Sequence, residues 1–402
     1  MKIVGIVCEY NPFHKGHEHQ IRLLREKGAE TVICAMSGNY TQRGELAIAD
    51  KYTRAESALR CGADLVVELP FPYSSLSAEG FCRAGVHILS SLGCDTLCFG
   101  SECADEALLT QAAEVVGSEA FITAYAEAQK SAGSAKAYFD TLSRFMGQDT
   151  ELLSNDILAI SYLSAIRNLG SGMKPYPIKR EGAAYTESKL EGLFPSATAI
   201  RKAVKEGTVG FQALTEAQLP AISLQALKSA EARGDAPMFP EKVGHDILSF
   251  FRLMSPSEIM SRAKNRSGGG EAVCQDGCGI LERLCSVARC SADYKGFLQS
   301  TYNSRYTDAR INRVILFSLF GASELFGKSL PDYTTLLAAS ERGRKYLSEI
   351  RKTATFPIVT KPADAPETAL TDLIRLSDSF YASAMPTARM PDFFMKKHPF
   401  MG

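Results

Sequence analysis

The architecture of this chain is indicated most clearly by one segment, Lys2-Ile-Val-Gly-Ile-Val-Cys-Glu-Tyr-Asn-Pro-Phe-His-Lys-Gly-His17. Its apolar run, residues 3–7, predicts a buried strand that ends before Asn11-Pro12. Residues 18–26 continue as a helix with apolar side chains at helical spacing. A strand that runs through a tight loop into a helix forms an anion site, because the first N–H groups of a helix have no partner within it.

Two histidines, His14 and His17, flank Gly16 where this helix begins. Imidazole N–H groups can donate to phosphate oxygens, and Gly16 allows close approach of the backbone. The alternative is that the histidines only cap the helix. Because the pair lies on a strand–loop–helix junction in the first strand of an alternating chain, we favour a nucleotide phosphate site.

The first half of the chain alternates between strands and helices, which predicts an α/β fold with a doubly wound parallel sheet. Right-handed crossovers place the loops after successive parallel strands at one edge of such a sheet. The loops at 37–43, 70–75 and 100–102 should therefore converge near the two histidines. We expect strands at 2–8, 31–36, 64–69 and 95–100, and helices at about 17–27, 50–61 and 77–92.

The rest of the chain is mainly helical in pattern. Residues 104–150 read as a helical insertion, and the proline-interrupted segment 174–180 suits a last or edge strand. From residue 206 onward we expect a mainly α-helical part. We therefore predict two domains, 1–205 and 206–402.

Composition sets broader limits. The 402 residues, of which 45% are hydrophobic, can bury a sizeable core. Basic and acidic residues both number 45, but residues 241–402 hold 22 basic against 17 acidic ones, a modest excess that an RNA-facing part can show. We expect neither a signal peptide nor a membrane span, since Met1-Lys2 leads straight into a short strand and no apolar run approaches about 20 residues.

The 11 cysteines occur without secretory context, which predicts free thiols and a cytoplasmic protein. Cys274, Cys278, Cys285 and Cys290 lack a usual zinc spacing. We favour small buried residues there over a metal site, and we expect no metal held by the protein itself.

A second motif strengthens the phosphate reading. Pro195-Ser-Ala-Thr-Ala-Ile-Arg201 begins a helix that Ser196 can cap, and Arg201 then reaches phosphates from its first turns. Together with residues 11–17, about 180 residues earlier, it resembles the two signatures of the HxGH nucleotidylyltransferase superfamily. The usual second signature has Ile where Pro195 stands and often Ser where Ala197 stands, so one hydroxyl–phosphate contact is absent.

The resemblance narrows further on five segments: 9–17, 36–45, 64–70, 99–102 and 155–158. They resemble the bacterial tRNA(Met) cytidine acetate ligase family, closely over about the first 205 residues and more loosely beyond. The resemblance implies a Rossmann-like (HUP-type) sheet and ATP-dependent activation of acetate to acetyl-adenylate, with Mg²⁺ accompanying ATP. The acetyl group then passes to N4 of the wobble cytidine in elongator tRNA(Met). No membrane or protein partner is expected.

The motifs and the resemblance together predict the site. His14 and His17 are the expected catalytic residues, which stabilise negative charge on the α-phosphate as pyrophosphate leaves. Asn155 could instead be an ordinary helix cap, Gly100 a turn glycine and Arg180 a surface cation. The residues expected to bind ATP are Val7, Cys8, Glu9, Tyr10, Asn11, Pro12, Phe13, His14, Lys15, Gly16, His17, Glu18, His19, Gln20, Gly100, Asn155, Arg180, Ser196, Thr198 and Arg201.

Other residues are expected to meet the second substrates. Arg43, in the loop after the second strand, is a candidate for acetate or acceptor-base recognition. Basic and aromatic residues that alternate favour phosphate contacts and base stacking. On this ground the tRNA is expected at Arg305, Tyr306, Arg310 and Arg313, with a second basic group at Arg342, Arg344 and Lys345, although either group could be a solvated helix face.

Two other functions stay open. One is a small-molecule nucleotidylyltransferase with the same motif, although such enzymes are usually much shorter. The other is a non-catalytic nucleotide-binding RNA factor, against which the intact histidine pair with Arg201 argues weakly. We see no general base for acetyl transfer in the sequence.

Overall fold

The fold is described from a computed structural model of the chain. The described residues are 1–129, 133–147, 152–180, 195–207, 210–266, 279–303, 306–323, 326, 328–351, 354 and 356–402.

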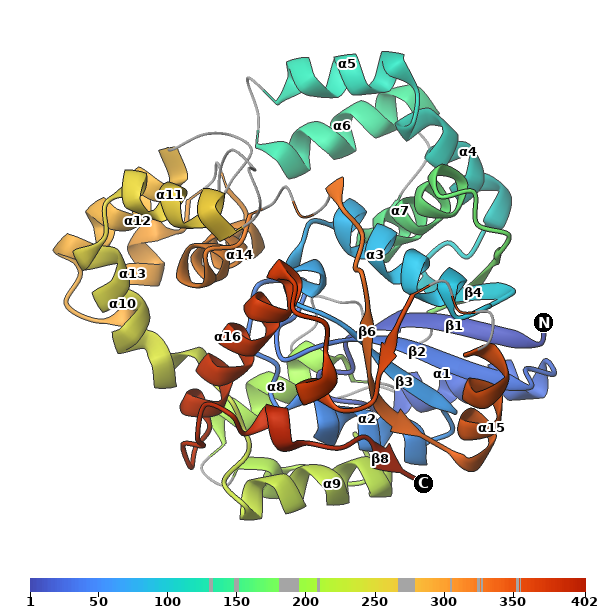
Figure 1. Ribbon diagram of the computed structural model, residues 1–402. Coiled ribbons are helices and arrows are strands. Elements are labelled where there is room, and N and C mark those ends of the chain that lie inside the picture. The colour runs from blue at the N-terminus through green and yellow to red at the C-terminus, as the bar shows by residue number, and fades with distance from the viewer. Residues whose placement is uncertain are drawn as a thin grey trace.

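One sheet runs through the middle of the molecule, in the order β5-β4-β1-β2-β3-β6-β7, with β8 also paired to β6 (Figure 1). The five strands from β5 to β3 are parallel, whereas β6 joins β3 in the antiparallel sense. The strands are β1 Ile3–Cys8, β2 Thr31–Ser37, β3 Leu65–Leu69, β4 Thr96–Ser101, β5 Lys174–Lys179, β6 Thr334–Ala339, β7 Ile358–Val359 and β8 Phe400–Met401.

The chain winds the parallel sheet in two directions. From β1 it proceeds through α1 (Lys15–Glu26), β2 and α2 (Lys51–Arg60) to β3. It then returns through α3 (Ala78–Ser91) to β4, on the other side of β1, and through α7 (Ser154–Asn168) to β5. The direction of winding thus reverses between β1 and β4. Ligands of open α/β sheets bind at the carboxyl edge beside such a reversal.

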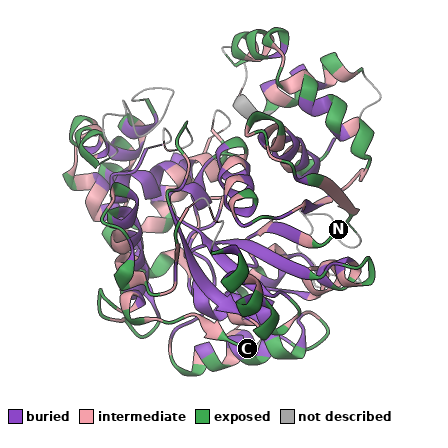
Figure 2. Cartoon of the chain, turned by 45° about the vertical axis from the view of Figure 1, so that its right-hand side comes forward, coloured by how far each residue is buried: buried purple, intermediate pink, exposed green. Residues whose placement is uncertain are grey.

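The predicted doubly wound α/β fold is confirmed, and local chemistry explains its boundaries. β2 and β3 are buried along their whole lengths, as strands covered on both faces must be (Figure 2). Asp50 caps α2, since its carboxylate accepts the N–H groups of Tyr52 and Thr53 at 2.9 and 3.2 Å. Gly5 allows close packing of β1 on α3, because a Cβ there would meet Leu89.

Three helices form the insertion predicted at 104–150: α4 (Glu106–Val116), α5 (Glu119–Ala128) and α6 (Ser134–Met146), above α7 in Figure 1. After β5 come α8 (Ala197–Glu206) and α9 (Ala221–Ala232), which share a small core of their own with Ile48. A further helical group consists of α10 Gly244–Leu253, α11 Pro256–Arg266, α12 Gly279–Cys290, α13 Tyr294–Thr301 and α14 Asp308–Phe320.

The end of the chain returns to the sheet, which the sequence analysis did not predict. β6, β7 and β8 extend it beyond β3, with α15 (Glu341–Ile350) and α16 (Ala369–Ala384) among them. The second half is thus helical but not separate, since it adds strands to the sheet of the first half. Short 3₁₀ turns complete the fold at Tyr73–Ser75, Gly210–Ala213, Pro240–Val243, Pro362–Asp364 and Phe394–Lys396.

No helix within the described ranges is long and apolar enough to cross a membrane.

Candidate active site

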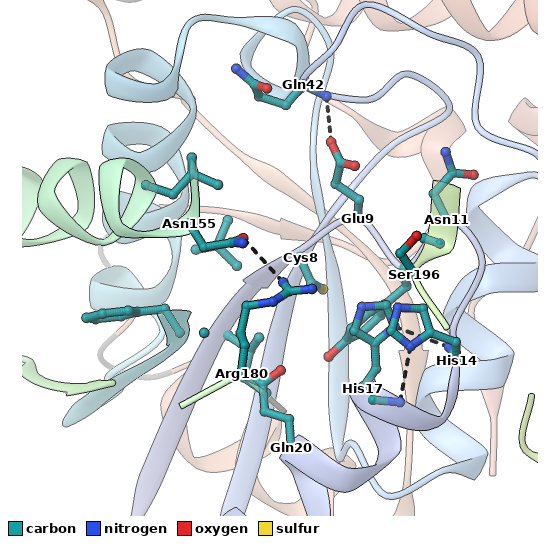
Figure 3. Close-up of a pocket in the computed structure, with 18 of the residues that line it drawn as sticks. Cys8, Glu9, Asn11, His14, His17, Gln20, Gln42, Asn155, Arg180 and Ser196 are labelled. Atoms are coloured by element: carbon teal, nitrogen blue, oxygen red, sulfur yellow. Dashed lines mark hydrogen bonds between the residues drawn. The ribbon is translucent and has the colours of Figure 1, made fainter. Parts of the chain in front are cut away.

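A pocket of about 270 Å³ opens at the carboxyl edge of the sheet, where the direction of winding reverses (Figure 3). The ends of β1, β4 and β5 form its floor, and the first turns of α1, α7 and α8 surround it. Gln42 and Arg43, from the loop after β2, complete the wall. Of the three loops expected near the histidines, those at 37–43 and 100–102 contribute Gln42, Arg43 and Gly100 to the pocket, whereas no residue of the loop at 70–75 lines it.

His14 and His17 hold each other at the start of α1. The Nδ1 atom of His14 accepts the Gly16 N–H at 3.1 Å, and Nδ1 of His17 accepts the His14 N–H at 3.2 Å. Their rings stack with centroids 3.7 Å apart, beside Ser196 (Figure 3). Since Nδ1 of each ring is an acceptor, each neutral imidazole carries its proton on Nε2. Both rings therefore cap the helix and also keep a donor.

The surroundings keep both imidazoles uncharged. Burial, with the guanidinium groups of Arg180 and Arg201 nearby, lowers the pKa of His14 to about 3. Burial and the neighbouring His14 lower the pKa of His17 well below its usual range. Two neutral N–H donors at a helix N-terminus can bind phosphate without losing a proton.

Arg180 reaches the pocket from the end of β5. Its Nη1 donates to Oδ1 of Asn155 at 3.2 Å, and Gly100 leaves room for it, since a Cβ there would lie 3.2 Å from Arg180 Cγ. Glu102 in turn accepts the backbone N–H groups of Asn155 and Asp156, both at 3.1 Å, and the Asn155 side-chain amide. Asn155 lies in the first turn of α7, whose cap is Leu153, so it orients Arg180 rather than capping the helix.

Arg201 reaches the pocket from α8. Ser196 caps α8 by accepting the Ala199 N–H at 3.1 Å, as predicted. One turn later Arg201 Nη1 donates to the backbone oxygen of Asn11 at 2.9 Å, and Nη2 lies 3.4 Å from Thr198 Oγ1. Arg180 and Arg201 thus both reach the pocket near His14.

Most residues predicted to bind ATP line this pocket, and so does Arg43. Four do not: Pro12, Phe13, Lys15 and Glu18. Phe13 is buried behind the pocket and packs against the rings of Tyr10 and His17, so it supports the wall. The lining residues from the predicted set are Val7, Cys8, Glu9, Tyr10, Asn11, His14, Gly16, His17, His19, Gln20, Gly100, Asn155, Arg180, Ser196, Thr198 and Arg201.

The sequence analysis missed the apolar side of the pocket. Phe81, Phe99, Leu158, Tyr162 and Ile178 line it, and Phe99 stacks on Tyr162 with centroids 5.6 Å apart. These side chains come from α3, β4, α7 and β5, where their spacing reads only as core. The remaining unpredicted lining residues are Ile6, Gln42, Lys179, Pro195 and Ala197.

The two basic groups occupy opposite edges of the sheet. Arg313 Nη1 donates to the backbone oxygen of Gln42 at 3.4 Å, and Arg310 lies 5.9 Å from the Tyr306 ring, so this group reaches the pocket rim. Arg305 lies outside the described residues.

The second basic group is not brought to the pocket, because α15 lies at the amino edge of the sheet. Arg342 donates to the backbone oxygen of Glu30, before β2, and Arg344 donates to the backbone oxygen of Gly402. Lys345 belongs to the same helix.

Of the four cysteines weighed as a cluster, Cys274 and Cys278 lie outside the described residues. Cys285 is buried in α12 and Cys290 is exposed. The part of the chain that the structure describes contains no group of three or more His, Cys, Asp or Glu residues that could hold a metal ion.

Comparisons with known proteins agree with this geometry. A family model described as HIGH Nucleotidyl Transferase matches residues 1–392. A tRNA(Met) cytidine acetate ligase of Caldanaerobacter subterraneus subsp. tengcongensis is 34% identical over all of this chain and 98% of the relative. The tRNA(Met) cytidine acetate ligase of Syntrophotalea carbinolica is 36% identical in a match that covers 90% of this chain and 85% of the relative.

Two solved structures of Thermotoga maritima TmcAL match the fold of this chain. Each match covers 100% of this chain and 99% of the TmcAL chain. The apo form has a TM-score of 0.87 at 31% identity, and the form bound with alpha-thio ATP has 0.85 at 32%. The assignment to a family rests on two findings. The family model covers residues 1–392, and the Caldanaerobacter relative is more than 30% identical to this chain over essentially the full length of both. The chain belongs to the tRNA(Met) cytidine acetate ligase family of HIGH nucleotidyl transferases.

Proposed function

We propose that this protein is an ATP-dependent ligase that activates acetate as acetyl-adenylate and transfers the acetyl group to N4 of the wobble cytidine of elongator tRNA(Met). The observation that carries the proposal is the pair of neutral, backbone-locked imidazoles in a pocket that Arg180 and Arg201 also line. Full-length similarity to ligases of that name, one of them solved with an ATP analogue, supports the choice of substrates.

The pocket suits ATP at both ends. The apolar side offers Phe81, Phe99 and Tyr162 to an adenine base, while the Nε2–H groups of the two histidines and the arginines offer donors to the triphosphate at the positive end of the α1 dipole. Acetate attacks the α-phosphorus, one carboxylate oxygen forms the new P–O bond, and pyrophosphate leaves with the electrons of the old one. Donors fixed before the reaction stabilise the charge that develops, and each such donor contributes about 10²–10³ in rate.

Mg²⁺ is proposed to arrive with ATP. Among the described residues no acidic cluster could hold it alone. Magnesium commonly binds through substrate phosphates and water, with one or two carboxylates at most, so this donor set fits a metal carried by the nucleotide. When bound, it would offset charge on the departing pyrophosphate.

The second substrates approach from the rim. Arg43 lies beside Gln42 on the pocket wall and is proposed to recognise the acetate carboxylate. Tyr306, Arg310 and Arg313 are proposed to contact the tRNA, because α14 reaches the same loop through the bond from Arg313 to Gln42. A tRNA substrate places the enzyme in the cytoplasm, and no protein partner is proposed.

Exchange of labelled pyrophosphate into ATP tests the activation step. The proposal predicts exchange that depends on acetate and does not need tRNA. Exchange that requires a phosphate ester in place of acetate would favour a small-molecule nucleotidylyltransferase. Tight ATP binding without exchange under any of these conditions would favour a non-catalytic nucleotide-binding factor.

A further inference from the structure

The charge of the pocket lining has one exception. Arg43, Lys179, Arg180 and Arg201 are cationic and the two stacked histidines are neutral, as suits a triphosphate. Glu9, directly after β1, is the one carboxylate among the described residues that line the pocket. A carboxylate beside bound phosphates costs binding energy through repulsion, so its presence calls for a use in the reaction.

Glu9 is held in a fixed position. Its Oε1 accepts the backbone N–H of Gln42 at 2.7 Å, so the side chain extends from the end of β1 to the loop after the neighbouring strand β2 (Figure 3). Buried Arg54 donates to the backbone oxygen of the same residue, as well as to those of Ser37 and Gly38, which fixes its backbone. No hydrogen bond from a described residue reaches Oε2, which leaves that oxygen to a donor on the substrate.

The other titratable groups considered in the pocket are poor proton acceptors, among them Cys8, because burial raises the pKa of its thiol well above the usual range and so keeps it protonated. His14 and His17 commit Nδ1 to backbone N–H groups and carry hydrogen on Nε2. Nδ1 of His19 lies 2.9 Å from Arg22 Nη2, a donor, so its ring is likewise engaged. Burial raises the pKa of Tyr10 and of Tyr162 well above the usual range, so both phenols stay protonated.

The ionisation of Glu9 suits a base. Burial raises the pKa of its carboxyl, and the Gln42 N–H and the nearby Arg201 lower it again only in part. A carboxylate with a raised pKa takes up a proton more readily than an ordinary glutamate.

We propose that Glu9 is the general base of the second half-reaction and accepts the proton that N4 of the cytidine loses during acetyl transfer. The inference rests on the proposed function. The N4 electron pair forms the bond to the acetyl carbonyl carbon, and the bond from that carbon to the adenylate oxygen breaks. AMP leaves with those electrons, Oε2 takes the N4 proton, and the protonated carboxyl returns it to water. Adenylation needs no such base, because acetate attacks as an anion.

The test separates the two half-reactions in Glu9→Gln. The amide oxygen of the variant can still accept the Gln42 N–H, so the loop keeps its anchor. Acetate-dependent pyrophosphate exchange should fall far less than acetyl transfer, because the adenylation donors are untouched. Transfer of acetyl from preformed acetyl-adenylate to tRNA should fall by about 10²–10⁴, the usual contribution of a general base. Glu114→Gln, exposed on α4, controls for loss of one negative charge.

Two further readouts exclude a merely structural role. Hydroxylamine needs no base from the protein, so Glu9→Gln should still release acetyl hydroxamate although its transfer to tRNA is lost. The decrease of the wild-type transfer rate at low pH should be absent from the variant. Equal loss in both half-reactions, or unchanged transfer, would overturn the role of Glu9. Failure of the wild-type enzyme to make any acetyl hydroxamate or acetylcytidine would instead overturn the proposed function.

Discussion

Lys51 Nζ lies 2.7 Å from Asp378 Oδ2, although 327 positions separate the two residues in the chain. The same ammonium group contacts both carboxylate oxygens of Glu68, at 2.8 and 2.9 Å, and the Lys51 and Glu68 side chains are only 2% exposed. Asn39 binds both the Lys51 backbone and Asp378. This network ties α16 to β3, α2 and the loop that carries Gln42 and Arg43, so the end of the chain helps to hold the active site.

Removal of the buried cation should destabilise the fold strongly. Lys51→Met leaves two carboxylates buried without a counter-charge, which costs about 3–5 kcal/mol in the free energy of unfolding. Urea denaturation measures the loss. Lys205→Met is the matched control, since its partner Glu241 and Lys205 itself are both 53% exposed, and its loss should be at most about 1 kcal/mol. Equal losses in the two variants would show that the buried network contributes nothing special.

The histidines should matter for adenylation beyond their role as caps. His17→Ala removes an Nε2 donor, and acetate-dependent pyrophosphate exchange should fall by about 10²–10³. His245→Ala, exposed on α10, should leave the exchange rate unchanged. A drop of less than threefold in His17→Ala would contradict the assigned role.

Stability should decrease in mild acid because of His14. In the unfolded chain this histidine takes up a proton below about pH 6.5, whereas its pKa in the fold is about 3, lowered by burial. The unfolded state therefore binds the extra proton between these values, and stability is present above pH 6.5 and lost as the pH falls. The expected loss is about 1.4 kcal/mol per pH unit.

His14→Asn lacks this titration and can still cap α1. Between roughly pH 5.5 and 4.5 the free energy of unfolding should thus fall by about 1.4 kcal/mol more in the wild type than in the variant. Urea denaturation at each pH measures this difference. Parallel stability curves would mean that His14 becomes protonated in the folded protein.

Arg180 should contribute to ATP binding through its planar guanidinium group. Arg180→Lys keeps the charge but loses the geometry of the bond to Asn155, and we expect ATP affinity to fall by about one order of magnitude, measured by calorimetry. Lys174→Arg, at the exposed other end of β5, is the reciprocal control. Unchanged affinity in Arg180→Lys would show that only charge is needed.

The two basic groups should differ in their contribution to the binding of an anticodon stem–loop RNA. Arg310→Ala should weaken binding and reduce the slope of log affinity against log salt by about one contact, or about 0.9 for a duplex stem. Arg344→Ala changes a residue at the amino edge of the sheet, and the slope should stay as in wild type. The reverse result would place the RNA on α15.

The sequence predicted the parallel half of the sheet because hydrophobic period and turn residues are local signals. The strand expected at 31–36 runs from Thr31 to Ser37, and the one at 95–100 from Thr96 to Ser101. β6 carried no such signal: it ends in Ala338-Ala339, a residue type depleted in strands, and its partner β3 lies more than 260 residues away. Its burial comes from tertiary contacts alone.

The residues of the site and of the network beside it also divide into those that the sequence could predict and those that it could not. Residues within motifs, such as His14, His17 and Arg201, were predictable because a phosphate site needs those groups near a helix start. Lys51 and Glu68 were not, since charged residues are almost always exposed and nothing nearby in the chain indicates their pairing. The apolar wall was hidden because Phe99 and Tyr162 have the spacing of ordinary core residues.

The proposed ligase activity can be measured by incubation of the purified protein with ATP, labelled acetate and total bacterial tRNA, followed by nucleoside analysis. We predict label in N4-acetylcytidine, confined to elongator tRNA(Met) and lost in His17→Ala. Acetate-dependent ATP turnover that leaves every tRNA nucleoside unlabelled would contradict the claim.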